Sequence, residues 1–289
     1  MYRILSPASA TCVTGRIDNI SLAFDIYNEI TAEEFDGAIV INNHADTMRN
    51  RNNLIAKSFY MTAEKLGYEP EGIRLGIKTA VPISRGLGSS ASCINAGVML
   101  GYLFSGRTFS KSEVYHTASE LFPEDKNLAA NLYGGLTITS RSASVTRAAV
   151  SADFVFTLVI PDYRIPSSRI EEHLLHDLSH EDYCESSALA TLFALGMTSK
   201  EPRLIRQSFG YSNIYEPAEL VKDLPVLSEI SKQAGALGIF ICGYDPAAAV
   251  ISENEENAKK LRNILTKEFP RDIVKSVHVS NTGITFTEE

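Results

Sequence analysis

The sequence of 289 residues has little of several features that mark particular classes of protein. It has only four cysteines, and none of them forms a Cys-x-x-Cys pair, so their spacing gives no zinc pattern. We interpret them as reduced, mostly buried thiols. No apolar run reaches the ~18 residues that span a membrane, and the first residues lack the apolar core of a signal peptide. We therefore expect a cytoplasmic protein.

Positive charge is also scarce. The chain has 27 Lys and Arg residues against 35 Asp and Glu residues, which gives a net charge of −8. This balance argues against nucleic acid as the main partner. An anionic small molecule stays possible, because helix N-termini and local basic groups can hold phosphate. The six histidines are scattered, and we read them as structural or surface residues.

Hydrophobic periodicity predicts an α+β protein. Predicted strands lie within residues 18–42 and at 72–78, 136–140, 154–160, 238–243, 247–251 and 275–287. Predicted helices lie at residues 52–66, 93–103, 110–121, 127–133 and 255–269, and the segment from 161 to 234 is largely helical. The polar, small residues at 140–152 suggest a division into domains of residues 1–150 and 151–289.

The most informative segment is the glycine- and serine-rich stretch at residues 82–92, which leads directly into a helical pattern. Small residues let a backbone approach a ligand, and a helix N-terminus offers unpaired N–H groups that suit phosphate. No Gly-Lys-Ser/Thr follows the glycines, so this is not the common ATPase loop. The glycine spacing also differs from the dinucleotide fingerprint. An ordinary strand-to-helix turn is the alternative to a phosphate-binding loop.

The string Pro-x-x-x-Gly-Leu-Gly-Ser-Ser-Ala at residues 82–91 resembles the phosphate-binding loop of the GHMP kinases. Further segments resemble homoserine kinases within that superfamily, at residues 7–18, 51–55, 127–136, 214–217 and 235–246. The resemblance implies a two-subdomain fold with an N-terminal ribosomal-S5-like half and a C-terminal ferredoxin-like half. It also implies Mg²⁺-dependent transfer of the γ-phosphoryl group of ATP to homoserine, in threonine synthesis, by an enzyme that is often a homodimer.

The resemblance also implies roles for individual residues. Asp18 and Asn127 would hold the amino-alcohol substrate, and Ser167 would lie near the transferred phosphate. Asp18 as a turn residue and Asn127 as a helix cap are the structural alternatives. The residues expected to hold the nucleotide are Asn53, Pro82, Arg85, Gly86, Leu87, Gly88, Ser89, Ser90 and Ala91.

The expected metal site departs from the family pattern. Ser90 would reach Mg²⁺, but the position of the family's metal-binding glutamate falls on Phe122. Glu120 or Glu124 could supply the carboxylate if the backbone shifts. We take Glu120 as the candidate, although it lies on a different face of the predicted helix from residue 122.

The substrate and phosphate regions depart from the pattern as well. Glu171 and Glu219 stand near the positions of two arginines that grip the substrate carboxylate, and a glutamate there would repel it. Asp245 adds negative charge beside the expected phosphate position. Two alternatives follow: a kinase for another small alcohol with a cationic or hydroxyl-rich end, and a non-catalytic relative that binds a nucleotide or metabolite.

Overall fold

Two sheet layers organise the chain, and the long strand β1 (Tyr2–Val13) takes part in both. The computed structural model describes residues 1–13, 19–35, 39–43, 52–140, 144–165, 179–209, 221–243 and 245–289. Within these residues no helix is both long and apolar enough to cross a membrane. The mixture of helices and mainly antiparallel sheet confirms the predicted α+β class.

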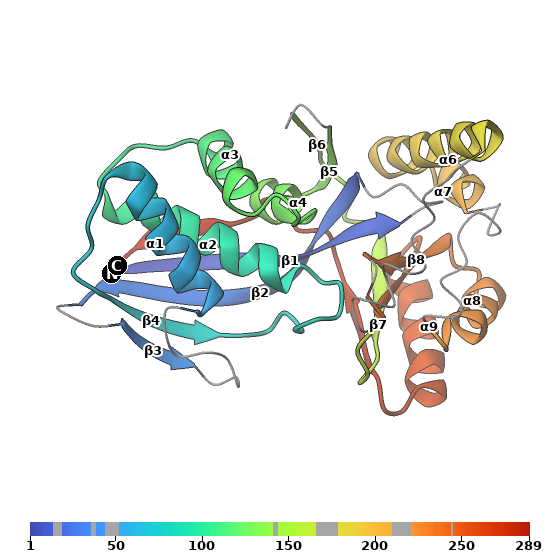
Figure 1. Cartoon of the computed structure of the whole chain (residues 1–289). Helices are drawn as coiled ribbons and strands as arrows, with labels where there is room; N and C mark the ends of the chain where they lie inside the picture. Colours follow the sequence, from blue (N-terminus) through green and yellow to red (C-terminus); the bar gives the residue numbers. More distant parts are fainter. Residues whose placement is uncertain are drawn as a thin grey trace.

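The first layer is a sheet with helices on one face (Figure 1). Its other strands are β2 (Ile20–Glu34), β3 (Ile39–Asn43), β4 (Ile73–Lys78), β5 (Leu136–Thr139), β6 (Val145–Ala148) and β11 (Thr285–Glu288). The helices are α1 (Leu54–Leu66), α2 (Ser89–Phe104), α3 (Lys111–Leu121) and α4 (Leu128–Tyr133). Every strand pair in this layer is antiparallel except β3 with β4. A buried apolar cluster joins the helices to the sheet.

The second layer follows the order β10-β7-β9-β8-β1. Its strands are β7 (Val155–Ile160), β8 (Gly238–Cys242), β9 (Ala248–Ser252) and β10 (Ile273–Val277). The helices of this half are α6 (His180–Ser199), α7 (Pro202–Ser208), α8 (Leu224–Gln233) and α9 (Glu255–Glu268). All six side chains of β7 are buried, which fits a sequence that is apolar except for Thr157.

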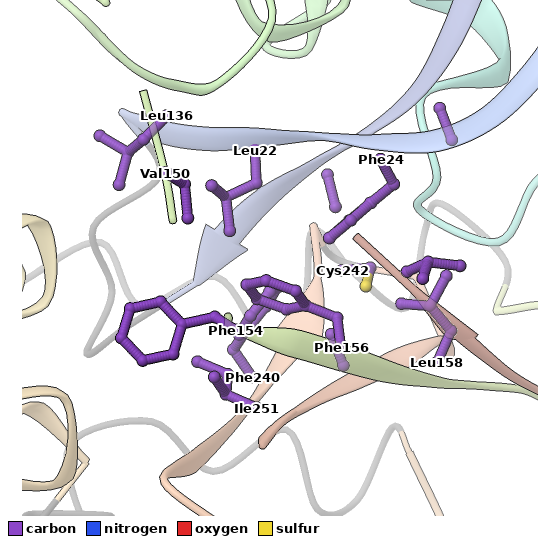
Figure 2. Close-up of a cluster of buried hydrophobic side chains, with 14 of the residues drawn as sticks. Leu22, Phe24, Leu136, Val150, Phe154, Phe156, Leu158, Phe240, Cys242 and Ile251 are labelled. Atoms are coloured by element: carbon purple, nitrogen blue, oxygen red, sulfur yellow. The ribbon is translucent and has the colours of Figure 1, made fainter. Parts of the chain in front are cut away.

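A single apolar cluster joins the two layers (Figure 2). Phe24 of β2 packs edge to face on Phe156 of β7, with ring centroids 5.3 Å apart. Phe156 in turn meets Phe240 of β8, with centroids 6.4 Å apart. Aromatic pairs at such distances add to the free energy gained by burying their area. The halves are therefore held together by core packing as well as by β1.

The structure confirms most of the predicted elements. Ser110 and Glu113 form the predicted capping box at the start of α3. Two strands, β1 and β6, were missed. β1 is rich in small and polar residues, and its register shifts at Pro7, where the missing N–H would otherwise interrupt the ladder. β11, at the far end of the chain, pairs with β1 in the first layer, so the division at residue 150 stays a prediction.

Candidate active site

A cavity of about 730 Å³ lies at the N-terminus of α2. The glycine-rich loop forms one wall with residues 83–90, and residues 124–127 form another. The remaining lining residues are Thr11, Arg164, Ile165, Gly243 and Asp245. Most of the residues expected to bind the nucleotide and one expected substrate residue, Asn127, therefore face one space.

The loop can reach this position only because glycines occupy two of its sites. Gly86 and Gly88 both have positive φ, of +76° and +67°. A side chain on Gly86 would overlap the carbonyl oxygen of Cys242, and one on Gly88 would overlap the Ser9 hydroxyl. Gly88 is the N-cap of α2, and no side chain caps this helix. The first amides of α2 are therefore left for a ligand or for water, beside the positive end of the helix dipole.

Arg85 fixes the loop to the second layer. Its Nε donates to the Pro161 carbonyl at 2.7 Å, and its Nη2 donates to the Asp162 carbonyl at 2.8 Å. Its Nη1 donates to carbonyls of the loop itself. The hydrogen bonds of this guanidinium thus hold the loop against the residues that follow β7. Leu87 is buried and its carbonyl accepts the Ser9 N–H at 3.1 Å.

The remaining loop residues divide by burial. Ala91 is buried beneath the loop, and Pro82 is half-buried at its start. Ser89 is half-buried and Ser90 is exposed, and both line the cavity. These two serine hydroxyls are therefore side-chain oxygens that the loop can offer, at the start of α2, to a ligand or a hydrated cation.

A buried polar network supports the loop from behind. Asn28 of β2 donates to the Ser92 hydroxyl at 3.0 Å and accepts the N–H groups of Ala80 and Val81, which precede the loop. Asn131 of α4 donates to the Pro7 carbonyl at 2.6 Å. Asn95 of α2 donates to Asn131 at 2.8 Å. Buried hydrogen-bond networks of this kind fix the relative positions of the elements that they connect.

Asp125 is a site residue that the sequence reasoning missed. It lies between α3 and α4, lines the cavity, and accepts the Asn127 N–H at 2.9 Å. Burial raises the pKa of its carboxyl, and the hydrogen bond from Asn127 opposes this shift in part. Its charge adds to burial in raising the pKa of the Cys93 thiol on α2 to about 12. A carboxylate therefore lies near the start of α2, although Phe122 occupies the expected glutamate position.

Asn127 is at the N-cap position of α4, but its side chain makes no capping bond there. Its Oδ1 instead accepts a hydrogen bond from the Thr11 hydroxyl at 3.4 Å. The amide therefore lies on the cavity side, where a ligand can reach it, and its role in substrate binding stays a prediction.

The other predicted metal ligand lies elsewhere. Glu120 is an exposed residue of α3 and forms an ion pair with Lys65 of α1. It is absent from the described residues that line the cavity, whereas Glu124 is among them. Phe122 follows α3, with the Lys57 ammonium 5.9 Å from the centre of its ring. Asp18, Ser167, Glu171 and Glu219 lie outside the described residues.

A second cavity, of about 350 Å³, meets the first at the loop. Ile83, Ser89, Ser90 and Arg164 line both cavities. Asn53 lines the second and caps α1, since its Oδ1 accepts the Ile55 N–H at 3.0 Å. The two spaces together offer an elongated ligand a phosphate-binding end and a more apolar end.

Comparison with known proteins agrees with this geometry. Residues 53–135 match the family of GHMP kinases, N-terminal domain. A homoserine kinase of Clostridium botulinum is 25% identical over 272 residues, which cover 92% of this chain and 91% of the relative. The crystal structure of a Cytophaga hutchinsonii homoserine kinase superposes with a TM-score of 0.86 at 21% identity, covering 99% and 96% of the two chains. The crystal structure of the Methanococcus jannaschii mevalonate kinase superposes with a TM-score of 0.73 at 16% identity, covering 97% of this chain and 98% of that one.

These matches define the class of protein: the chain has the GHMP kinase fold, and residues 53–135 are its GHMP kinase N-terminal domain. In sequence the chain is homoserine kinase-like, because its similarity to homoserine kinases extends over most of its length. The predicted resemblance is therefore confirmed.

Proposed function

We propose that this protein is an ATP-dependent small-molecule kinase that transfers the γ-phosphoryl group to the hydroxyl of L-homoserine, giving O-phospho-L-homoserine. The observation that carries the proposal is the glycine loop at the uncapped N-terminus of α2, which faces Asp125 and Asn127 across one cavity. The similarity to homoserine kinases over most of the chain supports homoserine as the first substrate to test.

The arrangement suits phosphoryl transfer, in which the protein mainly aligns the reactants and neutralises charge. The amides of residues 86–91 and the dipole of α2 would hold the phosphates. The second cavity, with Asn53 at its edge, would hold the nucleoside. Asn127 would orient the acceptor hydroxyl, since its Oδ1 is already held at the cavity by Thr11. A strong general base is not required for a loose transition state.

The residues beside the loop also fit Mg²⁺. This cation prefers oxygen ligands and usually keeps several waters while binding one or two carboxylates and the phosphates. The Asp125 carboxylate and the Ser90 hydroxyl supply such oxygens, and Glu124 is a further carboxylate of the same wall. When bound, the cation would neutralise the charge that develops on the phosphates. In this proposal Asp125 takes the role for which Glu120 was the candidate.

The test is release of ADP by purified protein with Mg·ATP and L-homoserine, run beside a panel of small amino alcohols and polyols. Gly88→Asp serves as the blank, because it places a charge in the loop and overlaps Ser9. Asp125→Asn is expected to lower turnover at least 100-fold, an effect of more than about 2.7 kcal/mol. Asp153→Asn is the matched control, because it removes the same charge at an exposed turn.

The panel also tests Glu171 and Glu219, the two glutamates that stand near the expected substrate-binding arginines. Turnover of another alcohol but not of homoserine would replace the proposed substrate. Glu171→Ala and Glu219→Ala would then be expected to weaken its apparent affinity, and unchanged affinity would remove them from the substrate site. No turnover of any compound by protein that still binds Mg·ATP would favour the non-catalytic alternative.

A further inference from the structure

Arg164 lies where the two cavities of the site meet. Four described residues line both cavities: Ile83, Ser89, Ser90 and Arg164. Arg164 is the one charged residue of these four, and it is also the only charged residue among the described residues that line the second cavity. A ligand that extends from one cavity into the other therefore passes beside this side chain.

The backbone on both sides of Arg164 is held in place. Arg85 of the loop donates to the carbonyls of Pro161 at 2.7 Å and Asp162 at 2.8 Å, so this segment is tied to the loop itself. Ile165, which follows Arg164, is buried in a small apolar cluster that includes a side chain of β8. Arg164 itself is exposed and lines the cavities. The packing of its neighbours thus sets its position relative to the loop.

The guanidinium of Arg164 is not neutralised by a described carboxylate. Within the part of the chain that the structure describes, Arg164 forms no ion pair. Arg85 differs, because its guanidinium donates to four backbone carbonyls. Lys126 lines the first cavity but not the second. Arg164 is therefore the cation that a ligand can reach at the junction, and its planar fork of N–H donors matches phosphate oxygens.

We propose that Arg164 is a specificity-determining residue that binds the phosphate directly attached to the nucleoside, and so makes the site discriminate nucleotides from nucleosides. This inference rests on the proposed nucleotide site and deepens it. The outer phosphates would occupy the amides of the loop and the nucleoside would occupy the second cavity, so the phosphate that joins them lies at the junction. A guanidinium at that point gives a charge-assisted contact that can be bidentate.

The proposal predicts a pattern of affinities. Arg164→Ala should weaken the binding of Mg·ATP and of AMP at least tenfold, which corresponds to about 1.4 kcal/mol. Adenosine lacks the phosphate and should bind with unchanged affinity. Magnesium pyrophosphate can fill the loop without reaching the junction, and salt screens an exposed charge at longer range, so its affinity should change less than about threefold. Arg164→Lys keeps the charge but loses the planar fork, and it should recover only part of the lost affinity.

The experiment is calorimetric titration of the full chain with Mg·ATP, AMP, adenosine and magnesium pyrophosphate, for the wild type, Arg164→Ala and Arg164→Lys. Arg203→Ala is the matched control, because Arg203 on α7 is also exposed and lies outside the described residues that line the two cavities. Thermal unfolding of each variant checks that it is folded. Release of ADP with Mg·ATP and L-homoserine tests the proposed function separately.

A loss of at least tenfold for Mg·ATP and AMP in Arg164→Ala, with adenosine and pyrophosphate nearly unchanged and no effect of Arg203→Ala, supports the proposal. Unchanged affinity for AMP overturns it. An equal loss for pyrophosphate also overturns it, because Arg164 would then act as a general positive charge of the cavity. A wild type that binds Mg·ATP but phosphorylates no alcohol contradicts the proposed function, and the four affinities still decide the role of Arg164. A wild type that binds no nucleotide contradicts both.

Discussion

Gly88→Ala tests whether the phosphate loop is held in place by close backbone packing. Gly88 caps α2 with φ of +67°, and a methyl group there would overlap the Ser9 hydroxyl and lie 2.7 Å from the Ser9 carbonyl oxygen. The chain offers a matched control at the other end of the same helix. Gly106 also has φ of +67°, but a methyl group on it would meet nothing within 4 Å.

Both substitutions carry the backbone cost of a left-handed φ, but only Gly88→Ala also carries the cost of overpacking. A non-glycine residue in the left-handed region costs about 1–2 kcal/mol. Forcing an extra carbon into a closely packed site costs typically 1–3 kcal/mol more. We therefore expect Gly106→Ala to lower the free energy of unfolding by about 1–2 kcal/mol and Gly88→Ala to lower it by about 2–5 kcal/mol.

Urea unfolding, extrapolated linearly to water, measures both differences. Calorimetry with Mg·ATP supplies the second readout, because relief of the overlap must move the loop away from Ser9. Gly88→Ala should weaken binding at least tenfold, about 1.4 kcal/mol, whereas Gly106→Ala should leave it unchanged. Equal loss of stability in the two variants would show that close packing adds nothing to the backbone cost, and the reasoning would be refuted.

Three other predictions follow from the site. Burial raises the Asp125 pKa above its unfolded value, so its contribution to stability is present at low pH and is lost as pH rises through the folded pKa. Asp125→Asn should therefore raise Tm by a few degrees at pH 7.5, with a gap that narrows towards pH 4, while weakening Mg·ATP binding; a lower Tm at pH 7.5 would contradict this. Arg85→Ala removes a part-buried charged hydrogen bond to the Pro161 carbonyl, just after β7, and an exposed one to the Asp162 carbonyl. Loss of the part-buried bond should cost about 1.5–3 kcal/mol in urea unfolding, whereas Arg262→Ala on α9 should cost little. Alkylation at pH 8 followed by site-resolved mass spectrometry should label the exposed Cys184 quickly and the half-buried Cys93 much more slowly, because burial raises the pKa of the Cys93 thiol to about 12. Labelling of Cys93 as fast as that of Cys184 in the folded protein would contradict the raised pKa.

Local signals in the sequence predicted the elements on which the loop depends. The capping box at Ser110 and Glu113 specifies the start of α3 by side-chain chemistry alone, and the apolar run of β7 needs no tertiary information. β1 lacks such a signal, because its strand conformation is imposed by neighbours on both sides and its ladder is irregular at Pro7. Whether such a segment forms a strand depends more on its tertiary pairing than on the β-propensity of its residues.

The sequence predicted the loop, where the backbone itself does the binding, and it also named Asn127 and the alternative carboxylate Glu124, which both line the cavity. Small residues and a following helix identify an amide-rich loop from sequence, so residues 86–91 could be named in advance. Asp125 could not be named, since it reaches the cavity from the turn after α3 rather than from a helical position. Glu120, five residues earlier in the last turn of α3, is exposed and pairs with Lys65. The fold of that turn separates the two residues.

The aromatic cluster shared by β2, β7 and β8 has a consequence for how ligands are exchanged (Figure 2). Two lobes that meet over a thin polar interface can hinge apart, but rings packed at 5.3 Å across the boundary would have to be exposed to water by such a motion. Exposure of buried aromatic area is costly. Ligand exchange is therefore expected to occur without separation of the two halves, and the two halves are expected to melt in one cooperative transition.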